Sequence, residues 1–333
     1  MKQAKDFKAI CLFVNQKLNE AQIDILKQNK NKLILCCSAG FDNIPLQKVK
    51  TCGIRVARVP SYSPSSIAEY AVSSILTLSK NLQKSYELTK KADFTICGLQ
   101  CILLEDKVAG VIGTGLIGRK TAEKISGLVS KVIRLAYLDK KYEYIYIIFL
   151  STIYILIYHT EASNFSTQVI CYDAYPDNEW MKSIPNAEYV ELEQLLSHSN
   201  VISIHVPLLK ETHHMINESA ISKMKDDVIL ANTSRGEVVK TSSIAQGLKS
   251  GKIFGVALDV FEGEKELIFK DMTRTGFKNH PELQELSCMN NVIMSSHIAF
   301  YTDESVRQIT EKTFQNFKTF VQNEALDEKA FVI

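Results

Sequence analysis

The amino-acid sequence has almost no excess of charge of either sign. Its 333 residues include 39 lysines and arginines against 37 aspartates and glutamates, which gives a formal net charge of +2. No run of like charges is long enough to form a charged tail. This balance offers no electrostatic reason to expect a nucleic acid or an anionic membrane surface as a partner.

The eight cysteines lack the spacing of a metal site. Cys36 and Cys37 are adjacent, and Cys97 and Cys101 have no second Cys or His pair that would complete a zinc site. No secretory apolar segment follows Met1. We therefore expect reduced thiols that mostly fill the core, no bound metal, and a cytoplasmic location.

The sequence does contain a regular alternation of strand-length apolar runs with helix-like segments. A chain of this length can form two ordinary domains. Apolar strands that alternate with helices indicate parallel sheets covered on both faces, so we predict an α/β chain with two sheets. The expected strands are 8–14, 32–40 and 54–60 in a first series, then 107–113, 168–173, 201–207, 227–234, 253–261 and 291–297 in a second.

A long helix is predicted over residues 63–88. Ser63 and Pro64 precede an apolar repeat with helical spacing. Its apolar face would either pack into the core or contribute to a dimer interface. The residues of that face are Ile67, Tyr70, Ala71, Ser74, Ile75 and Leu78.

A glycine-rich turn follows the strand expected at 107–113. Gly113, Gly115 and Gly118 form the pattern G-x-G-x-x-G. The first glycine permits a tight turn, the second lets a pyrophosphate approach the backbone, and the third allows close packing of helix on strand. The motif alone is a weak signal, but its position between a strand and a helix-like segment is typical of dinucleotide binding.

The acid that should accompany this turn lies at an unusual distance. Asp173 ends the next apolar strand and has the character of the residue that bonds the ribose hydroxyls. It lies 55 residues beyond Gly118, whereas about 20 is usual. The excess contains a nearly continuous apolar run, Tyr144–Tyr158.

Three explanations compete for this run. As a transmembrane helix it would span about 22 Å, against a hydrocarbon core of roughly 30 Å. As an inserted strand or hairpin it would be an exposed, uncharged segment of a kind that aggregates. We favour a retained intron, because removal of residues 132–168 restores the usual spacing and the codons of Val132 and Gln168 can supply the GT and AG borders.

Polar side chains follow three of the expected strands. Arg235 lies just past one strand, and His297 ends the last. Asp259 ends a third, with Glu264 five residues later. Singly, each has an ordinary explanation, such as a surface ion pair for the arginine. Because ligands of an open parallel sheet bind outside the carboxyl ends of its strands, their shared position favours one site beside the glycine turn.

These side-chain types suit hydride transfer to a 2-keto acid, for which a nicotinamide cofactor supplies the hydride. Arg235 can bind the carboxylate and polarise the keto oxygen. His297 can donate and accept a proton near neutral pH. An adjacent carboxylate such as Glu264 favours the protonated imidazole that reduction requires.

With these motifs in place, the sequence resembles the D-isomer-specific 2-hydroxyacid dehydrogenases, and within them the D-lactate branch. The resemblance covers about residues 9–320, apart from the apolar stretch 143–159. It implies a doubly wound, Rossmann-type NAD domain and a smaller, flavodoxin-like α/β substrate domain. The segments that carry it include CCSAGFDNI, RVPSYSPSSIAEYAV, GVIGTGLIG, CYDAYP, HVPLLKETHHMINESAISKMK, NTSRGEVV, GVALDVFEGE and NVIMSSHIAFYT.

The resemblance also implies a role for each matching residue. Arg235 would bind substrate, Glu264 would partner the histidine, and His297 would be the acid and base. Asp173, in place of a basic residue, favours NAD over NADP. His205 would either touch the site or pack beneath it.

The remaining implied roles are in binding. Tyr62 and the amides of Ala39 and Gly40 would line the carboxylate pocket. The residues expected around NAD are Gly113, Gly115, Leu116, Ile117, Gly118, Asp173, Val206, Pro207, Thr212, Thr233, Ser234 and Asp259.

The sequence departs from the family pattern in two places. Ile298 stands where the lactate branch usually has glutamine, and a glyoxylate or hydroxypyruvate reductase is the closest alternative, to be decided by the pocket near Tyr62 and Phe300. The family also opens with a strand and helix before 8–14, so the substrate domain is expected to lack its first strand. An omitted central strand would leave unpaired backbone groups.

Taken together, these features predict an NAD-dependent enzyme that interconverts pyruvate, or a similar 2-keto acid, and the D-hydroxy acid. The substrate domain would comprise residues 1–61 and 300–333, and the NAD domain 62–299 with the anomalous insert 132–168. We expect a homodimer with no membrane or nucleic-acid partner. NAD-sensing corepressors, which share this fold and bind partners, are an alternative of another class, as is a non-folding product of a faulty gene model.

Overall fold

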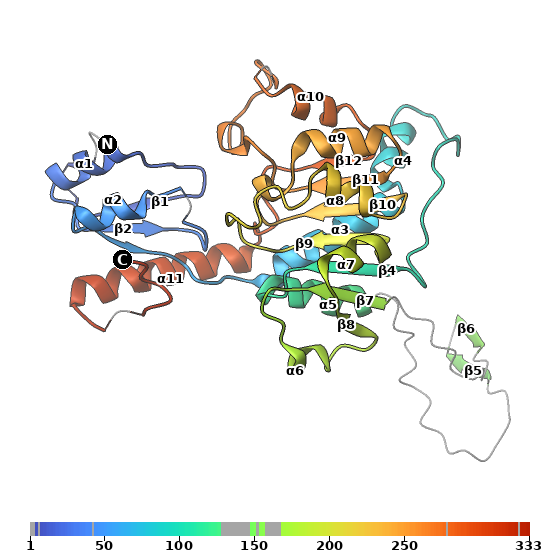
Figure 1. The fold of residues 1–333 in the computed structure, drawn as a ribbon, viewed down its shortest axis with the longest axis horizontal. Coiled ribbons are helices and arrows are strands. Elements are labelled where there is room, and N and C mark those ends of the chain that lie inside the picture. The colour runs from blue at the N-terminus through green and yellow to red at the C-terminus, as the bar shows by residue number, and fades with distance from the viewer. Residues whose placement is uncertain are drawn as a thin grey trace, which may run out of the picture.

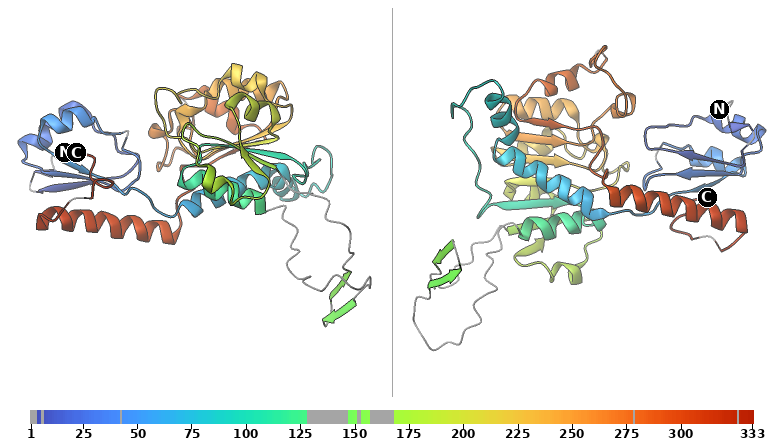
Figure 2. Two further views of the ribbon diagram at one scale, coloured as in Figure 1. Left: turned by 60° about the horizontal axis from the view of Figure 1, so that its bottom comes forward. Right: turned by 180° about the vertical axis from the view of Figure 1, so that it is seen from behind.

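The computed structural model describes residues 4–5, 7–41, 43–127, 147–150, 153–156, 168–277, 279–325 and 327–333. Apart from a small hairpin, these residues form two separate bodies, each built around a parallel sheet (Figures 1 and 2). The predicted α/β fold with two sheets is therefore confirmed.

The segment assigned to a retained intron lies mostly outside the described residues. Two short pieces of it, β5 (Ile147–Leu150) and β6 (Ile153–Leu156), pair as an antiparallel hairpin. The backbone of these pieces therefore has the form expected of an inserted hairpin, while the intron explanation stays a hypothesis. Among the helices of the described part, none is both long enough and apolar enough to cross a membrane.

The larger sheet has seven strands in the order β12-β11-β10-β9-β4-β7-β8, and every neighbouring pair is parallel. The chain runs outward from β4 to β8 on one side and from β9 to β12 on the other. The strand order therefore reverses between β4 and β9, and ligands of open α/β sheets bind at such a point. The strands are β4 (Val108–Ile112), β7 (Gln168–Tyr172), β8 (Ala187–Tyr189), β9 (Val201–Ile204), β10 (Val228–Asn232), β11 (Ile253–Leu258) and β12 (Val292–Met294).

Helices cover both faces of this sheet. One core cluster joins α3, α5 and α6 to it, and a second joins α7 to α10. Because both faces are covered, the central strands read as continuous apolar runs; all five residues of β10 are buried. The helices are α3 (Pro64–Ser79), α5 (Leu116–Gly127), α6 (Asn178–Met181), α7 (Leu192–His198), α8 (Glu218–Lys223), α9 (Thr241–Lys249) and α10 (Pro281–Ser287).

The helix predicted over 63–88 is in fact two helices. α3 ends at Ser79, and α4 (Leu82–Thr89) begins after Asn81, whose φ of 49° is left-handed. Asparagine tolerates this conformation better than most residues, so the break has a local cause. The apolar face of α3 packs into the core through Ile75 and Leu78, which favours the core explanation for that face.

The smaller sheet contains β1 (Ala9–Leu12), β2 (Leu33–Cys36) and β3 (Arg55–Ala57), parallel and in that order. Because β1 pairs directly with β2 over four residues, no gap opens inside this described sheet. Its helices are α1 (Glu20–Gln28), α2 (Leu46–Thr51) and α11 (Asp303–Gln322).

The last described residues close the free edge of β3. Val332 N donates to Val56 O at 2.9 Å, and Arg58 N donates to Ala330 O at 2.8 Å. The smaller body is therefore assembled from segments far apart in sequence (Figure 1). The domain boundaries near residues 61 and 300 stay a prediction.

Candidate active site

The glycine turn joins β4 to α5 at the switch point of the large sheet. A Cβ on Gly113 would lie 2.8 Å from the carbonyl carbon and oxygen of His205, and one on Gly118 would collide with Gly113 O. A Cβ on Gly115, in contrast, would meet nothing within 4 Å. Gly113 and Gly118 are thus needed for packing. Gly115, in contrast, leaves open space beside the first amides of α5, where a pyrophosphate can approach.

Asp173 lies beside this turn despite its distance in sequence. β7 pairs with β4 so that Tyr172 lies opposite Ile112. Thr114 donates to Asp173 Oδ2 from its backbone N at 2.6 Å and from Oγ1 at 2.9 Å. The carboxylate is therefore fixed at the carboxyl end of β7, where the ribose acid of a dinucleotide site is expected.

His297 and Glu264 form a close, shielded pair. His297 Nδ1 lies 3.0 Å from Glu264 Oε1, and the Glu264 side chain is 8% exposed. Phe261 N donates to the other carboxylate oxygen at 3.2 Å. The carboxylate therefore orients the imidazole so that its Nε2 is available for proton transfer. The predicted partnership of these two residues agrees with this geometry.

Asp259 holds the loop that carries the histidine. Its buried carboxylate accepts hydrogen bonds from Ser295 Oγ at 2.7 Å, Ile298 N at 2.8 Å and Ala299 N at 2.9 Å. His297 N donates to Asp259 O at 2.9 Å. These bonds hold His297 at a left-handed φ of 57°. The predicted place of Asp259 beside NAD stays a prediction.

Arg235 extends from the loop after β10, which a buried asparagine organises. Asn232 Oδ1 accepts from Ser234 N at 3.0 Å and from Ser234 Oγ at 2.8 Å, and Asn232 Nδ2 donates to Arg235 O at 2.9 Å. The prediction from sequence missed Asn232. Its signal was present, since a polar residue at the end of an apolar strand needs a buried hydrogen-bond partner.

An aromatic cluster lies next to the histidine. The Phe300 ring lies 6.4 Å from the His297 ring and 5.9 Å from the Tyr62 ring, between centroids, and Phe13 lies 6.2 Å from Phe300. Burial raises the pKa of Tyr62, and the positive charge of Arg235 only partly offsets it. Tyr62 is therefore a neutral hydroxyl donor close to Arg235.

The predicted carboxylate loop follows β2. Ser38 Oγ donates to Gly40 O at 2.8 Å, and an Nη1 group of Arg58 donates to Ala39 O at 3.0 Å. These bonds satisfy the two carbonyls of the loop, and the amides of Ala39 and Gly40 remain the groups predicted to bind a carboxylate.

The remaining predicted cofactor residues build the loop after β9. Thr212 Oγ1 donates to Pro207 O at 2.6 Å and accepts from Leu209 N at 2.8 Å. Next to this loop, Thr233 Oγ1 lies 3.5 Å from His205 Nδ1. Val206 contacts the glycine turn from the same loop, because its Cγ1 would lie 2.9 Å from a Cβ on Gly113.

His205 acts as a packing residue beneath the turn. Its Nε2 lies 2.8 Å from Ser203 Oγ. Although the residue as a whole is only partly buried, desolvation lowers the pKa of its ring to about 3. The ring is therefore neutral at physiological pH, which favours the packing explanation over an acid–base role.

A second histidine–carboxylate pair, missed from the sequence, supports the loop that precedes Glu264. Glu262 Oε1 lies 2.6 Å from His214 Nε2, and Thr241 N donates to Glu262 Oε2 at 2.7 Å. Burial alone would raise the pKa of Glu262, but the hydrogen bonds from Thr241 and His214 outweigh it and lower the pKa. Glu262 thereby ties three segments of the large body together.

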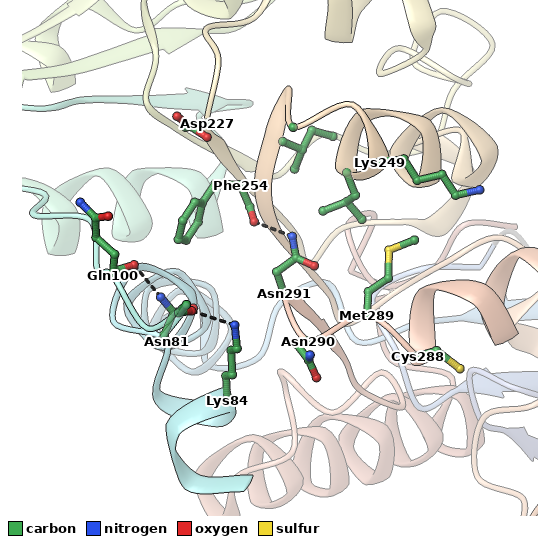
Figure 3. Close-up of a pocket in the computed structure, with 14 residues that line it drawn as sticks. Asn81, Lys84, Gln100, Asp227, Lys249, Phe254, Cys288, Met289, Asn290 and Asn291 are labelled. Carbon is green, nitrogen blue, oxygen red and sulfur yellow. Dashed lines mark hydrogen bonds between the residues drawn. The ribbon is translucent and has the colours of Figure 1, made fainter. Parts of the chain in front are cut away.

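A cavity of about 640 Å³ lies at the opposite edge of the large sheet (Figure 3). It is lined by the amino-terminal end of β11, by the residues that precede β12, by the end of α9, and by α4 with the segment after it. Asn81, Lys84 and Asn291 donate hydrogen bonds to backbone carbonyls there. None of the predicted site residues lines it. Within the described ranges, no cluster of three or more His, Cys, Asp or Glu side chains could hold a metal ion.

The open glycine turn at a switch point, with a histidine–carboxylate pair at the same edge, defines a nicotinamide-dependent dehydrogenase of the doubly wound α/β class. Residues 158–299 match a family model described as "D-isomer specific 2-hydroxyacid dehydrogenase, NAD binding domain". A D-lactate dehydrogenase of Escherichia coli is 31% identical over 323 residues, which cover 97% of this chain and 86% of that protein. The chain belongs to the D-isomer-specific 2-hydroxyacid dehydrogenases, a family of NAD-dependent oxidoreductases that act on small 2-hydroxy acids.

Solved structures agree with this assignment. The D-lactate dehydrogenase of Aquifex aeolicus, complexed with NAD and lactic acid, is 37% identical, with a TM-score of 0.78 and coverage of 99% of this chain and 88% of that chain. A pyruvate reductase of Chlamydomonas reinhardtii is 30% identical, with a TM-score of 0.80 and coverage of 98% and 86%.

Proposed function

We propose that this protein is an NAD-dependent D-lactate dehydrogenase that interconverts pyruvate and D-lactate. The observation that carries the proposal is the shielded Glu264–His297 pair, with its two side chains 3.0 Å apart, next to the aromatic ring of Phe300. Similarity to proteins named D-lactate dehydrogenase supports pyruvate as the substrate.

The residues divide the reaction between them. NADH, when bound, supplies the hydride that attacks C2 of the keto acid. Arg235 binds the substrate carboxylate and withdraws charge from the keto oxygen, with the amides of Ala39 and Gly40 assisting at the carboxylate. His297 donates its proton to that oxygen, and Glu264 stabilises the imidazolium before the transfer. In the reverse direction His297 removes the hydroxyl proton.

The cofactor would lie along the carboxyl edge of the large sheet. Its pyrophosphate would lie against Gly115 and the first amides of α5, formed by Leu116 and Ile117, and its ribose hydroxyls on Asp173. The loops that contain Thr212 and Thr233 would contact the rest of the NAD molecule.

NADH oxidation by the purified chain tests the proposal directly. Pyruvate, glyoxylate and hydroxypyruvate are each assayed, and the product is identified with enzymes specific for D- or L-lactate. We expect the highest kcat/KM with pyruvate and D-lactate as the product. A higher kcat/KM with glyoxylate or hydroxypyruvate would reassign the substrate, and no oxidation with any of the three would refute the activity.

Replacement of Asp173 by alanine is expected to weaken discrimination against NADPH. Loss of the hydrogen bonds to the ribose hydroxyls should raise the KM for NADH by about tenfold to a hundredfold, and that for NADPH far less. Steady-state kinetics with both cofactors measure the change. Asp226→Asn, at an exposed ion pair with Lys252 before β10, is the matched control and should alter neither value. Equal loss with both cofactors would contradict a ribose-binding role.

We also propose a homodimer that uses α4 and the extended segment after it. Phe94 and Ile96 on this segment are 79% and 87% exposed, and the segment lies along the outside of the large body (Figure 1). Such exposed apolar side chains are more common at interfaces than on free surfaces. Light scattering of the purified protein should give the mass of two chains, and Phe94→Asp with Ile96→Asp should give that of one. A dimer that survives both substitutions would place the interface elsewhere.

A further inference from the structure

Two thiols lie on neighbouring strands of the smaller body, and neither is among the residues assigned to catalysis. Cys11 is in β1, and Cys37 is the first residue after β2. Leu12 pairs with Cys36, and Cys37 N donates to Leu12 O at 2.9 Å. Because side chains alternate along a strand, Cys11 and Cys37 share one face of the sheet, while Cys36 points to the other. The two thiols therefore lie on neighbouring strands, and each perturbs the pKa of the other.

The two sulfurs differ in acidity. The interaction with the Cys11 thiol lowers the pKa of Cys37 to about 6, and burial opposes this shift. The same interaction raises the pKa of Cys11. At neutral pH the pair therefore holds one thiolate and one thiol, as in a reactive cysteine with a resolving partner. Cys36, in contrast, is buried, and burial raises its pKa to about 12.

We propose that Cys11 and Cys37 form a modification site for peroxides, at which oxidation closes a disulfide and weakens binding of the keto acid. The Cys37 thiolate attacks one oxygen of the peroxide, the O–O bond breaks, and hydroxide leaves. The resulting sulfenic acid is attacked by the Cys11 sulfur, whose proton leaves with the hydroxyl as water. Both sulfurs are oxidised, the peroxide is reduced to two waters after hydroxide takes up a proton, and an added dithiol reverses the change.

The link to substrate binding runs through the residues next to Cys37. Cys37 packs in one cluster with Phe13, Tyr62 and Phe300, the aromatic wall beside the catalytic histidine. The next residue, Ser38, begins the carboxylate loop and accepts from Val59 N at 3.1 Å. Cys11 pairs with Leu35 and not with Cys37. Because a disulfide requires a narrow geometry, its formation displaces Cys37 and the carboxylate loop that follows it. This half of the proposal rests on the proposed function.

The site itself is tested by chemistry that needs no enzyme activity. The full chain is treated with hydrogen peroxide, quenched with catalase and alkylated, and its peptides are analysed by mass spectrometry. We expect a Cys11–Cys37 disulfide with Cys36 still a free thiol. Cys11→Ser should leave a sulfenic acid on Cys37 that dimedone captures, and Cys36→Ala should still form the disulfide. Alkylation of Cys37 by iodoacetamide should reach half its maximal rate near pH 6. A Cys37 that stays unreactive at neutral pH, or that bridges to another cysteine, would overturn the site.

The consequence for binding is tested on the same samples. The oxidised protein should show a KM for pyruvate raised on the order of tenfold, restored by dithiothreitol, with the Kd for NADH unchanged because the glycine turn lies in the other body. Cys11→Ser should keep its KM after peroxide. A disulfide without any change in KM would refute the effect on binding but not the site. An absence of activity in the reduced protein would refute the proposed function, while the peptide analysis would still decide on the site.

Discussion

Replacement of His297 by glutamine is expected to lower kcat for pyruvate reduction by about 10²- to 10⁴-fold, the usual contribution of a positioned general acid. Glutamine retains a hydrogen-bonding side chain of similar reach, but it cannot deliver a proton. The Kd for NADH should be unchanged, because the histidine lies on the loop after β12 and the glycine turn follows β4. Stopped-flow or steady-state oxidation of NADH measures kcat, and cofactor fluorescence measures Kd.

Two further variants separate proton transfer from general damage. His198→Gln, on the exposed end of α7, is the matched control and should be as active as the parent. Glu264→Gln should lower kcat by less than His297→Gln does, because it removes the partner of the acid rather than the acid itself. If His297→Gln keeps more than a tenth of the parent kcat, His297 is not the proton donor.

Replacement of Arg235 by glutamine is expected to lower kcat/KM for pyruvate by about 10²- to 10³-fold. The reason is the loss of charged hydrogen bonds, each worth about 1.5–3 kcal/mol. Both constants should change: KM should rise because the substrate carboxylate loses its ion pair, and kcat should fall because the keto oxygen loses its electrophile. Steady-state kinetics over a range of pyruvate concentrations resolve the two contributions.

Arg235→Lys distinguishes charge from geometry. Lysine keeps the positive charge but not the planar fork that binds a carboxylate through two parallel bonds. We therefore expect the Arg235→Lys enzyme to have a lower KM than Arg235→Gln, but a kcat that is nearly as low. Arg307→Gln, which removes exposed ion pairs on α11, should leave both constants unchanged. An Arg235→Gln enzyme with unaltered KM would assign carboxylate binding to other groups.

The parts of the site that follow local rules could be predicted from sequence. The turn from Gly113 to Gly118 is encoded within six residues, and its strand and helix flank it directly. Arg235, Glu264 and His297 could be placed because each follows an apolar run, and parallel strands bring such positions to one edge. The same rule predicted that Asp173 stands next to the turn, although the intervening segment hid the usual spacing.

What could not be predicted depends on contacts between distant segments. The roles of Asn232 and Asp259 require knowing which amides face their side chains, and sequence periodicity carries no such information. The contact between Glu262 and His214 joins loops 48 residues apart. The break at Asn81 was missed because an apolar repeat continues across it. Whether the helix also continues depends on the backbone conformation of this one residue.

The closure of β3 by the last described residues has a consequence for how the protein is made. Ala57 leaves the ribosome about 270 residues ahead of Phe331, its bridge partner. At typical rates of synthesis this interval lasts roughly 15 to 55 seconds. During that time the large body is synthesised, and the edge of β3 keeps its backbone groups exposed. Holding this edge away from other chains is therefore a task for the chaperones that meet the growing polypeptide.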